Sequence, residues 1–595
     1  MINTRNISKE LMKTINIFTL FTIFFTAVGV SAQEPLSKDV RVVREFDPTV
    51  SDAMKINQMP DREDTLEINP QFNYRVVGQP LAGSPKVEPM SAARLARQHK
   101  GELYPSYVRG GLGNYETLFG EIFYNITRNE KFAFALSLGQ EFSWGNIELE
   151  DGASSEAPLH RTNGGIYLRH FFDDKTLEFD MDFNRRAYEY YGYQTISTTD
   201  ENPEFYDNGE GSLVPGDALI PDRKQRQTAF DLHVGLLGQQ SDVDDTRYHM
   251  GFDYGAFDNY TGVGENRFSL SGDLKLPLGA AGMHLDGGVS FNKVNAPKGE
   301  NEMQFLWTFE EREQIFLTLN PKMVIPGDKL SVEIGVNATG EFSGTEDFYL
   351  SPHVKGDLVI AEGIVSTFLG MTGEVRPGYY RDMMAENPFL SPDVLVETAH
   401  SNIRGFAGVK GNFSSATSFT ARLDYEFIEN EHFYENRFFQ ENGTTNYGMS
   451  NLFTVSYDDV SLLTLSGELL VRPVRQLDII LKGAYFGWEL DVLEHAWHKP
   501  EMEIGLRAGY QFSEELRLDA AFNLLGERKA RDLNAIDGVK MLKSVADFNL
   551  GGNYQLNRRL HFFGRIQNIF AAKYYQWSGY PMQGINFRLG AGYSF

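Results

Sequence analysis

The stretch that decides the fold is the last twelve residues, which read Gly584-Ile585-Asn586-Phe587-Arg588-Leu589-Gly590-Ala591-Gly592-Tyr593-Ser594-Phe595. Every second residue from Ile585 to Phe595 is apolar, and the residues between them are polar or glycine. A period of two over this length predicts a β-strand with one apolar face and one wet face. A soluble β-sandwich can also end on such a strand, so the fold depends on the rest of the chain.

Similar alternation recurs far upstream of this strand, in 132–139, 248–255 and 516–523. The polar face of these stretches carries charges, which indicates contact with water rather than with a packed core. In a membrane, only a closed barrel satisfies the backbone groups of such strands. On this basis we expect Phe252 to face lipid and Asp253 to face the lumen. The residues that we expect to line the lumen are Arg517, Asp519, Asn523, Asn586 and Arg588.

The lengths of the connections between these stretches support a barrel. Short turns recur, for example near 173–175, 279–282, 326–328, 474–476 and 557–559. Between many of them lie longer polar loops, which we place at 147–162, 194–225, 376–399, 435–449 and 527–543. Alternation of short and long connections is typical of periplasmic turns and extracellular loops. We therefore predict an all-β fold, a transmembrane antiparallel barrel of about 22 strands over residues 106–595.

Composition excludes several classes of protein. The formal charge of −26 lacks the basic footprint that nucleic-acid binding needs. Aromatic residues make up 13% of the chain, Gly occurs 57 times, and mean hydropathy is −0.34, as suits a barrel that is apolar outside and polar inside. Cysteine is absent, which rules out a disulfide, a thiolate metal site or a thiol nucleophile.

The first 105 residues differ in character from the rest. Residues 1–32 combine basic residues, an apolar run and a small-residue end at Ala32, which predicts a cleaved signal peptide. Residues 33–105 are rich in proline and mixed charge and read as an irregular leader. Within the leader, 40–46 has the pattern of a strand that could add to the sheet edge of a periplasmic partner. The other interpretation is a leader that lies in or beneath the barrel lumen.

Two motifs near the C-terminus resemble known families. The pattern Arg588-x-Gly590-x-x-Tyr593-x-Phe595 resembles the terminal signal of bacterial outer-membrane barrels, which the barrel-insertion machinery engages. Asn568-Ile569-Phe570 with Tyr574, and Gly579-Tyr580-Pro581 before the last strand, resemble the end of TonB-dependent receptor barrels. The resemblance implies a 22-stranded barrel around an N-terminal plug, engagement of TonB, and import of iron chelates, cobalamin or oligosaccharides. Residues 33–105 are too few for that plug, so we expect a barrel without it.

Aromatic side chains cluster at the expected outer ends of strands. They could stack on the sugars of a ligand, form an interfacial girdle, or brace the extracellular loops. The clusters are Tyr188, Tyr190, Tyr191 and Tyr193; Phe433, Tyr434, Phe438 and Phe439; and Tyr574, Tyr575, Trp577 and Tyr580.

Motifs for metal binding or catalysis are weak. The acidic loop 194–225 could hold Ca²⁺, but it lacks EF-hand spacing, so a solvated loop is the simpler interpretation. His495 and His498 would chelate a metal on a helix, whereas Pro500 and the flanking strands indicate a loop. No Gly-x-Ser-x-Gly signature occurs. We therefore expect neither an enzyme nor a resident cofactor.

Together these features predict a multi-pass, porin-like barrel in the outer membrane of a Gram-negative cell. Its expected function is transport of solutes or macromolecules through a polar lumen. The alternative is a scaffold for an outer-membrane protein complex, docked through the leader. Expected partners are outer-membrane lipid, the barrel-insertion machinery, and TonB or another envelope protein.

Overall fold

The computed structural model describes residues 104–126, 129–150, 152–192, 223–238, 246–296, 311–344, 346–440 and 447–595. Its main feature is one sheet of 22 antiparallel strands, as the sequence predicts. The barrel strands are β1 (Ser106–Gly113), β2 (Thr117–Ile126), β3 (Phe132–Ser143), β6 (Leu159–Phe171), β7 (Lys175–Glu189), β8 (Lys224–Gly238), β9 (Arg247–Asn259), β10 (Gly264–Leu278), β11 (Ala281–Asn295), β12 (Arg312–Ile325), β13 (Leu330–Phe342), β14 (Glu346–Ala361), β15 (Val365–Arg376), β16 (Ala399–Ser414), β17 (Thr417–Gln440), β18 (Tyr447–Val474), β19 (Leu477–Leu490), β20 (Met502–Gln511), β21 (Leu516–Leu525), β24 (Val545–Gln555), β25 (Leu560–Gln567) and β28 (Asn586–Ser594).

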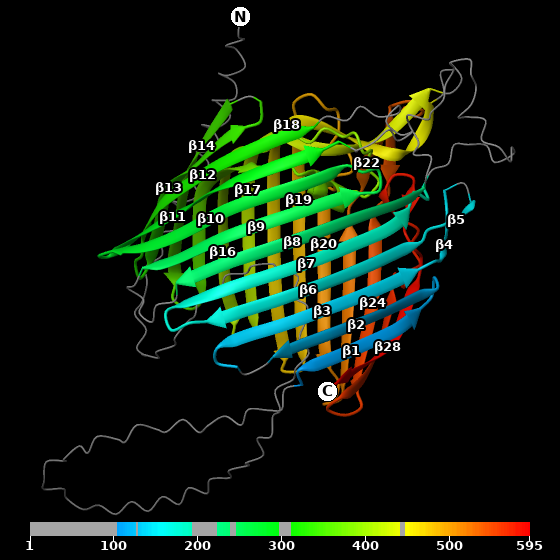
Figure 1. Cartoon of the computed structure of the whole chain (residues 1–595), viewed down its shortest axis with the longest axis horizontal. Helices are drawn as coiled ribbons and strands as arrows, with labels where there is room; N and C mark the ends of the chain where they lie inside the picture. Colours follow the sequence, from blue (N-terminus) through cyan, green and yellow to red (C-terminus); the bar gives the residue numbers. More distant parts are fainter. Residues whose placement is uncertain are drawn as a thin grey trace, which may run out of the picture. The chain divides into compact units, whose positions relative to one another are not determined.

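The sheet closes on itself through its first and last strands. β28 pairs with β25 on one side and with β1 on the other, so no edge strand remains in this sheet. The Ser106 amide donates to the Phe595 carbonyl at 3.1 Å, and the Phe595 amide donates back at 2.9 Å. Figure 1 shows this seam, where blue β1 lies beside red β28. Closure satisfies the backbone groups that an open sheet would leave unpaired in lipid.

The two faces of the sheet differ as the alternating sequence predicts. Leu270, Leu317 and Leu589 point outward, with exposed fractions of 52%, 56% and 63%. Phe252 is on this outer face, whereas the neighbouring Asp253 points inward and bonds to His233. The barrel therefore carries an apolar belt outside and a polar wall inside.

Because neighbouring strands are antiparallel, the connections alternate between two rims. One rim carries most of the short turns, and the other carries the long loops together with the short connections 114–116, 260–263 and 343–345. The predicted turns near 173–175, 279–282, 326–328, 474–476 and 557–559 fall between consecutive strands at the first rim, here called the short-turn rim. The opposite rim, the long-loop rim, carries the predicted loops. By the rule for outer-membrane barrels, the long-loop rim is extracellular.

Three predicted loops contain more regular structure than expected. The loop predicted at 147–162 includes the hairpin of β4 (Asn146–Glu148) and β5 (Ser154–Glu156), and 527–543 includes that of β22 (Arg528–Arg531) and β23 (Val539–Leu542). The bounds of the loop predicted at 435–449 were wrong, since β17 continues to Gln440 and β18 already begins at Tyr447. These long strands are stabilised because Phe433 and Phe453 at their ends are fully buried.

The predicted signal peptide and the leader up to residue 103 lie outside the described residues, so the expectation that a plug is missing is not tested. In the part of the chain that the structure covers, no helix is both long and apolar enough to cross a membrane. One short helix, α2 (Tyr380–Glu386), occurs between β15 and β16. The sequence predicts a polar loop there, whereas α2 and the residues around it pack inside the barrel.

Candidate functional site

The connection from β15 to β16, residues 377–398, folds into the barrel at the long-loop rim. We call it the inward segment. Although it leaves the wall at β15, it contacts β7, β8 and β10, several strands away around the barrel. Tyr380, Met383 and Met384 of α2 are buried, which explains why an apolar stretch occurs inside a predicted loop. The segment thus spans part of the lumen instead of extending into solvent.

A carboxylate of the wall holds the start of α2. Glu265 on β10 accepts hydrogen bonds from the Tyr380 amide at 3.1 Å and the Arg381 amide at 2.8 Å. These amides belong to the first turn of the helix, where backbone donors lack partners within the helix. Glu265 therefore replaces the N-cap side chain that Tyr379 does not provide.

An ion pair fixes the same turn to a second strand. Arg381 donates through both terminal nitrogens to the carboxylate of Asp231 on β8, with Nη2 to Oδ2 at 2.7 Å. Two parallel hydrogen bonds give this pair a defined orientation as well as charge complementarity. We call it the Arg381–Asp231 latch.

The end of α2 is held by the opposite part of the wall. Glu386 Oε2 accepts hydrogen bonds from Tyr434 Oη at 2.9 Å and from His432 Nε2 at 3.1 Å, both on β17. Burial raises the pKa of Glu386, but the His432 hydrogen bond and the Lys499 charge outweigh it, and its pKa falls to about 2. The carboxylate is therefore ionised across the physiological range, and polar contacts hold both ends of the helix.

An apolar cluster fills the space between the inward segment and the walls. Phe389 stacks on Tyr580 with ring centroids 3.5 Å apart, and Tyr188 donates from its hydroxyl to the Pro388 carbonyl at 2.5 Å. The cluster, which we call the mouth core, draws on strands and loops from distant parts of the barrel. Its buried members are Tyr188, Tyr190, Ala229, Phe257, Val263, Tyr380, Met383, Met384, Phe389, Leu390, Val396, Tyr434, Leu452, Phe453, Trp577 and Tyr580.

Each of the three predicted aromatic clusters contributes at least one residue to the mouth core. Tyr188, Tyr190, Tyr434 and Tyr580 are between 1% and 7% exposed, so they brace the loops and offer no open stacking surface. Phe433 belongs to a second buried cluster with Trp497. Tyr193 and the side chain of Phe439 lie outside the described residues. The same is true of nearly all of the acidic loop 194–225, which was considered as a Ca²⁺ site.

His498 joins two loops at the edge of the mouth core. Its Nδ1 lies 2.7 Å from the Tyr434 carbonyl, and its Nε2 accepts the Ser578 amide at 3.3 Å. These partners require a neutral ring with its proton on Nδ1. Burial lowers the pKa of His498 to about 3, which agrees with that state. Both nitrogens are engaged with backbone, so the His495–His498 pair serves the loop structure.

Beneath the inward segment lies a polar cavity of about 340 Å³. Tyr379 from the segment forms part of its lining, and the other residues come from β7 to β11. The charged lining is mainly acidic: Asp180, Asp182, Asp231 and Asp253, with His233 and Arg267. A cavity with this lining can hold a hydrated solute that offers hydrogen-bond donors or positive charge.

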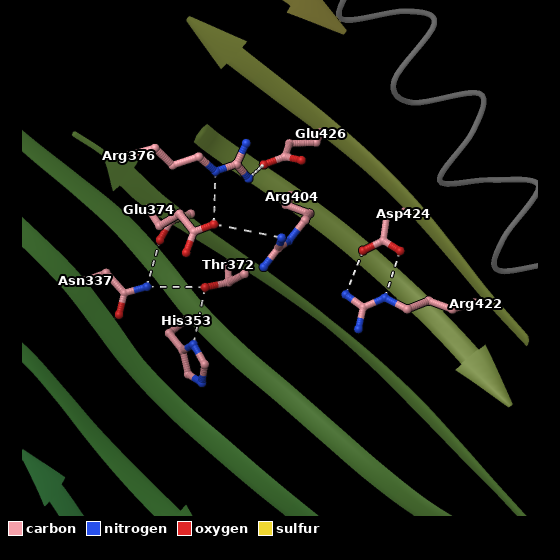
Figure 2. Close-up of polar contacts among 10 residues, drawn as sticks. Asn337, His353, Thr372, Glu374, Arg376, Arg404, Arg422, Asp424 and Glu426 are labelled. Carbon is pink, nitrogen blue, oxygen red and sulfur yellow. Dashed lines mark hydrogen bonds and ion pairs between the residues drawn. The ribbon is translucent and has the colours of Figure 1, made fainter. Parts of the chain in front are cut away.

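The wall from β13 to β17 is also polar, but its charges are paired (Figure 2). Glu374 accepts from Arg376 Nε at 3.2 Å and lies 3.9 Å from Arg404, while Arg376 also binds Glu426. Arg422 binds Asp424 through two hydrogen bonds of 2.6 and 2.7 Å. Because Arg376 ends β15, this network fixes the point where the inward segment leaves the wall.

The residues predicted to line the lumen belong to β21 and β28, and none of them lines the cavity. Arg517 Nε is 3.1 Å from Asp519 Oδ1, and Arg588 Nη2 is 2.8 Å from Glu141 Oε1. Asn586 is 5% exposed and donates to Gln583 at 2.9 Å. Asn523 lies opposite Asp547 in the β21–β24 register.

The residues of the predicted barrel-assembly signal occupy β28 and the chain end. Tyr593 and Phe595 face outward with exposed fractions of 43% and 53%. Gly590 faces inward beneath the ring of Phe563, where an added Cβ would lie 2.4 Å from the ring. The glycine of this pattern therefore permits close packing at the seam.

Sequence reasoning missed Arg381, Asp231 and Glu265, which join the segment to the wall. Asp231 and Glu265 fit the alternation of β8 and β10 and so resemble any other inward polar residue. The available signal was the apolar content of the predicted loop, where Met383, Met384 and Phe389 stand among polar residues. Such residues indicate burial, but they do not identify the strand that they contact.

Comparison with solved structures places the barrel fold among outer-membrane receptors. The FrpB iron transporter from Neisseria meningitidis superposes with a TM-score of 0.60 at 9% identity, over 83% of this chain and 82% of that one. The ferric-catecholate import receptor Fiu from E. coli K12 gives 0.57 at 12% identity, over 83% and 82%. The siderophore receptor PirA from Acinetobacter baumannii gives 0.57 at 10% identity, over 83% and 81%.

The likeness lies in the fold. No protein-family model matches the sequence, and no curated protein matches it. The chain has the closed 22-stranded barrel of TonB-dependent siderophore receptors, as the sequence resemblance implied, and this fold is that of an outer-membrane protein. The neighbours are transport receptors and not enzymes, and they lend no support to the scaffold alternative.

Proposed function

We propose that the protein is a gated transport barrel of the outer membrane, in which the inward segment opens to admit a solute to the lumen. The observation that carries this proposal is the position of the inward segment between a polar cavity and the long-loop rim. The Arg381–Asp231 latch and the Glu386 contacts hold the segment to separate parts of the wall. Such polar contacts can be exchanged for contacts to water or solute when the segment moves.

The chemistry of the cavity favours a neutral or cationic polar solute. Asp180, Asp182, Asp231 and Asp253 face the cavity, and they outnumber the two arginines near them, Arg267 in the lining and Arg381 bound to Asp231. A net negative charge in a recess of low dielectric concentrates counter-ions. Structural neighbours include a ferric-catecholate import receptor and a ferric enterobactin receptor. A catecholate is an anion, which the acidic lining of this cavity disfavours, so the proposed solute is of a different kind.

We further propose that a periplasmic energy-coupling protein such as TonB engages the leader, residues 33–105. The first barrel strand begins at Ser106 on the short-turn rim, which is the periplasmic rim of an outer-membrane barrel. The leader is therefore attached on the side where such a partner acts. A pull-down with TonB C-terminal domain, comparing the mature chain with one lacking residues 33–105, tests this partner.

Passage through the lumen is tested by conductance in planar bilayers. Four proteins form the set: the mature chain, the chain without 33–105, the chain with 379–396 replaced by a short Gly-Ser linker, and the double variant. The linker is geometrically feasible because Arg376 and Ala399 are direct partners in the β15–β16 register. We expect replacement of the inward segment to raise conductance, either alone or once the leader is removed.

The outcomes separate the alternatives. If all four proteins are folded and none conducts, passage through the lumen is rejected. If removal of the leader alone opens a stable pore, the leader and not the inward segment is the gate. In either case the segment would be a fixed structural element of the rim.

A further inference from the structure

Three metal-ligating side chains converge on the inner wall below the cavity. Glu178, His233 and His249 come from the neighbouring strands β7, β8 and β9, and one ligating atom of each lies within 4.8 Å of the others. Glu178 and His249 are close to the ends of their strands at the short-turn rim. His233 also lines the cavity, so the cluster continues the same wall downward.

A glycine leaves the space into which both histidines point. Gly235 is on β8, two residues after His233, with β7 and β9 on either side. A Cβ added to Gly235 would be 2.8 Å from His233 Nε2 and 3.3 Å from His249 Nε2. The same Cβ would be 3.5 Å from Glu178 Cβ. The two imidazole nitrogens are therefore directed at one small volume that no side chain fills.

The nitrogen of His249 at this point has no role in the protein's own hydrogen bonding. His249 Nε2 is buried, and within the described residues it has no hydrogen-bond partner. Buried polar atoms are nearly always paired, so an orphaned imidazole nitrogen needs an explanation. A metal ion held between His249 and His233 provides one.

Surrounding residues orient the ligands. His233 Nδ1 lies 2.6 Å from Asp253 Oδ1, and Asp253 Oδ2 accepts from Ser269 at 3.2 Å. A carboxylate on Nδ1 keeps the proton there and leaves the Nε2 lone pair free, which is the usual support of a metal-binding histidine. Arg169 Nε lies 2.5 Å from Glu178 Oε1, which leaves the second carboxylate oxygen for an ion.

We propose that Glu178, His233 and His249 bind a divalent transition metal ion, with Zn²⁺ the best match. Two imidazoles and one carboxylate suit Zn²⁺, and three protein ligands leave a position open to water or to a donor atom of a passing solute. Of the three residues, His233 also lines the cavity, so a solute held there would lie beside the ion. This inference does not depend on the proposed gating, since a barrel that conducts nothing would still bind the ion.

The test is a zinc titration of tag-free mature protein in detergent, after removal of metals with a chelator. Competition with a chromophoric chelator gives stoichiometry and affinity. We expect one tight equivalent, a loss of roughly 100-fold or more in affinity for His249→Ala, and a loss of about 10- to 100-fold for Asp253→Asn. Gly235→Val, which places a side chain in the ion's position, should also abolish tight binding.

A matched control and a second readout keep the test decisive. His284→Ala removes an imidazole from β11 outside the cluster and should leave zinc affinity unchanged. Co²⁺ in place of Zn²⁺ should give visible ligand-field bands that His249→Gln removes, while the heat-dependent gel shift verifies that the barrel remains folded. Absence of tight binding, or equal affinity in wild type and His249→Ala, overturns the proposal.

Discussion

Arg381 and Asp231 are separated by 150 positions in the sequence, yet Arg381 Nη2 lies 2.7 Å from Asp231 Oδ2 inside the barrel. Asp231 belongs to the wall, and Arg381 belongs to a segment that leaves the wall at β15. Together with the Glu265 and Glu386 contacts and the mouth core, this pair holds the inward segment against the wall. It is therefore the most direct place to perturb the inward segment without altering the barrel.

Arg381→Ala should increase access to the cavity from the long-loop rim. Because the native chain has no cysteine, Ser269→Cys gives a single thiol in the cavity lining. Loss of a partly exposed, charged hydrogen-bonded pair destabilises the docked position of the inward segment by about 1–2 kcal/mol. This predicts roughly tenfold faster labelling of the thiol.

The control for the latch is Arg226→Ala, which removes an ion pair with Asp258 on the outer face. Labelling of Ser269→Cys should not change in this variant. An Arg381→Asp, Asp231→Arg double variant should restore slow labelling in part. If Arg381→Ala labels at the wild-type rate, the latch does not hold the segment.

His498 should make the loops at the mouth core sensitive to acid. Burial lowers its pKa to about 3, whereas an unfolded histidine titrates near 6.5. As pH falls below about 6.5, the open state takes up a proton that the closed state excludes. Local stability should therefore decrease by at most about 1.4 kcal/mol per pH unit between 6.5 and 3.

Hydrogen exchange of residues 574–582 at pH 7.5 and pH 5 measures this effect. After each rate is divided by the intrinsic exchange rate at the same pH, we expect a lower protection factor at pH 5 than at pH 7.5 in wild type. His498→Asn, which cannot take up the proton, should show a smaller pH difference although it is less protected at pH 7.5. An equal pH difference in both proteins would assign the effect to another group.

Phe389→Ala should loosen the mouth core locally and leave the barrel intact. The ring is 7% exposed and stacks on Tyr580, and truncating a buried Phe typically costs about 3–5 kcal/mol. Hydrogen exchange of the inward segment should accelerate, with little change in β19–β21. Phe348→Ala removes a ring that is 75% exposed and should change neither, so similar effects in both variants would contradict the core.

The two faces of β9 should respond differently to substitution. Phe252→Arg places a charge on the lipid face and should lower the free energy of unfolding by roughly 2–4 kcal/mol if the site is near the bilayer midplane. Asp253→Asn removes a charge from the wet face and should cost much less. A urea titration in lipid vesicles compares them, and equal costs would mean that the faces are assigned incorrectly.

Sequence alternation was sufficient for the barrel, because every strand has only two faces and lipid permits one polarity outside. The strand number and most short turns followed from the same pattern. Strand ends above the membrane were less predictable: Phe433 and Phe453 extend β17 and β18 by packing against residues far away in the sequence. Such contacts leave no periodic signal.

The contacts of the inward segment could not be predicted for the same reason. Arg381 finds Asp231, and Tyr188 finds Pro388, only after the barrel has placed their strands across a common lumen. The residues singled out on β21 and β28 do not line the cavity, because alternation predicts which residues face inward but not which of them form a site. Conversely, His233 and His249 become a possible ligand pair only through the register of β8 and β9.

The seam between β1 and β28 also bears on how the molecule assembles. Every other neighbouring pair of barrel strands is joined by a connection within the chain, whereas Ser106 and Phe595 meet across almost the whole barrel sequence. Hairpins can form from local segments, but this last ladder carries the largest loop-closure entropy and the highest sequence separation. Ring closure should therefore be the late step of folding, and until it occurs both seam strands are open edges that an insertion factor can hold by strand pairing.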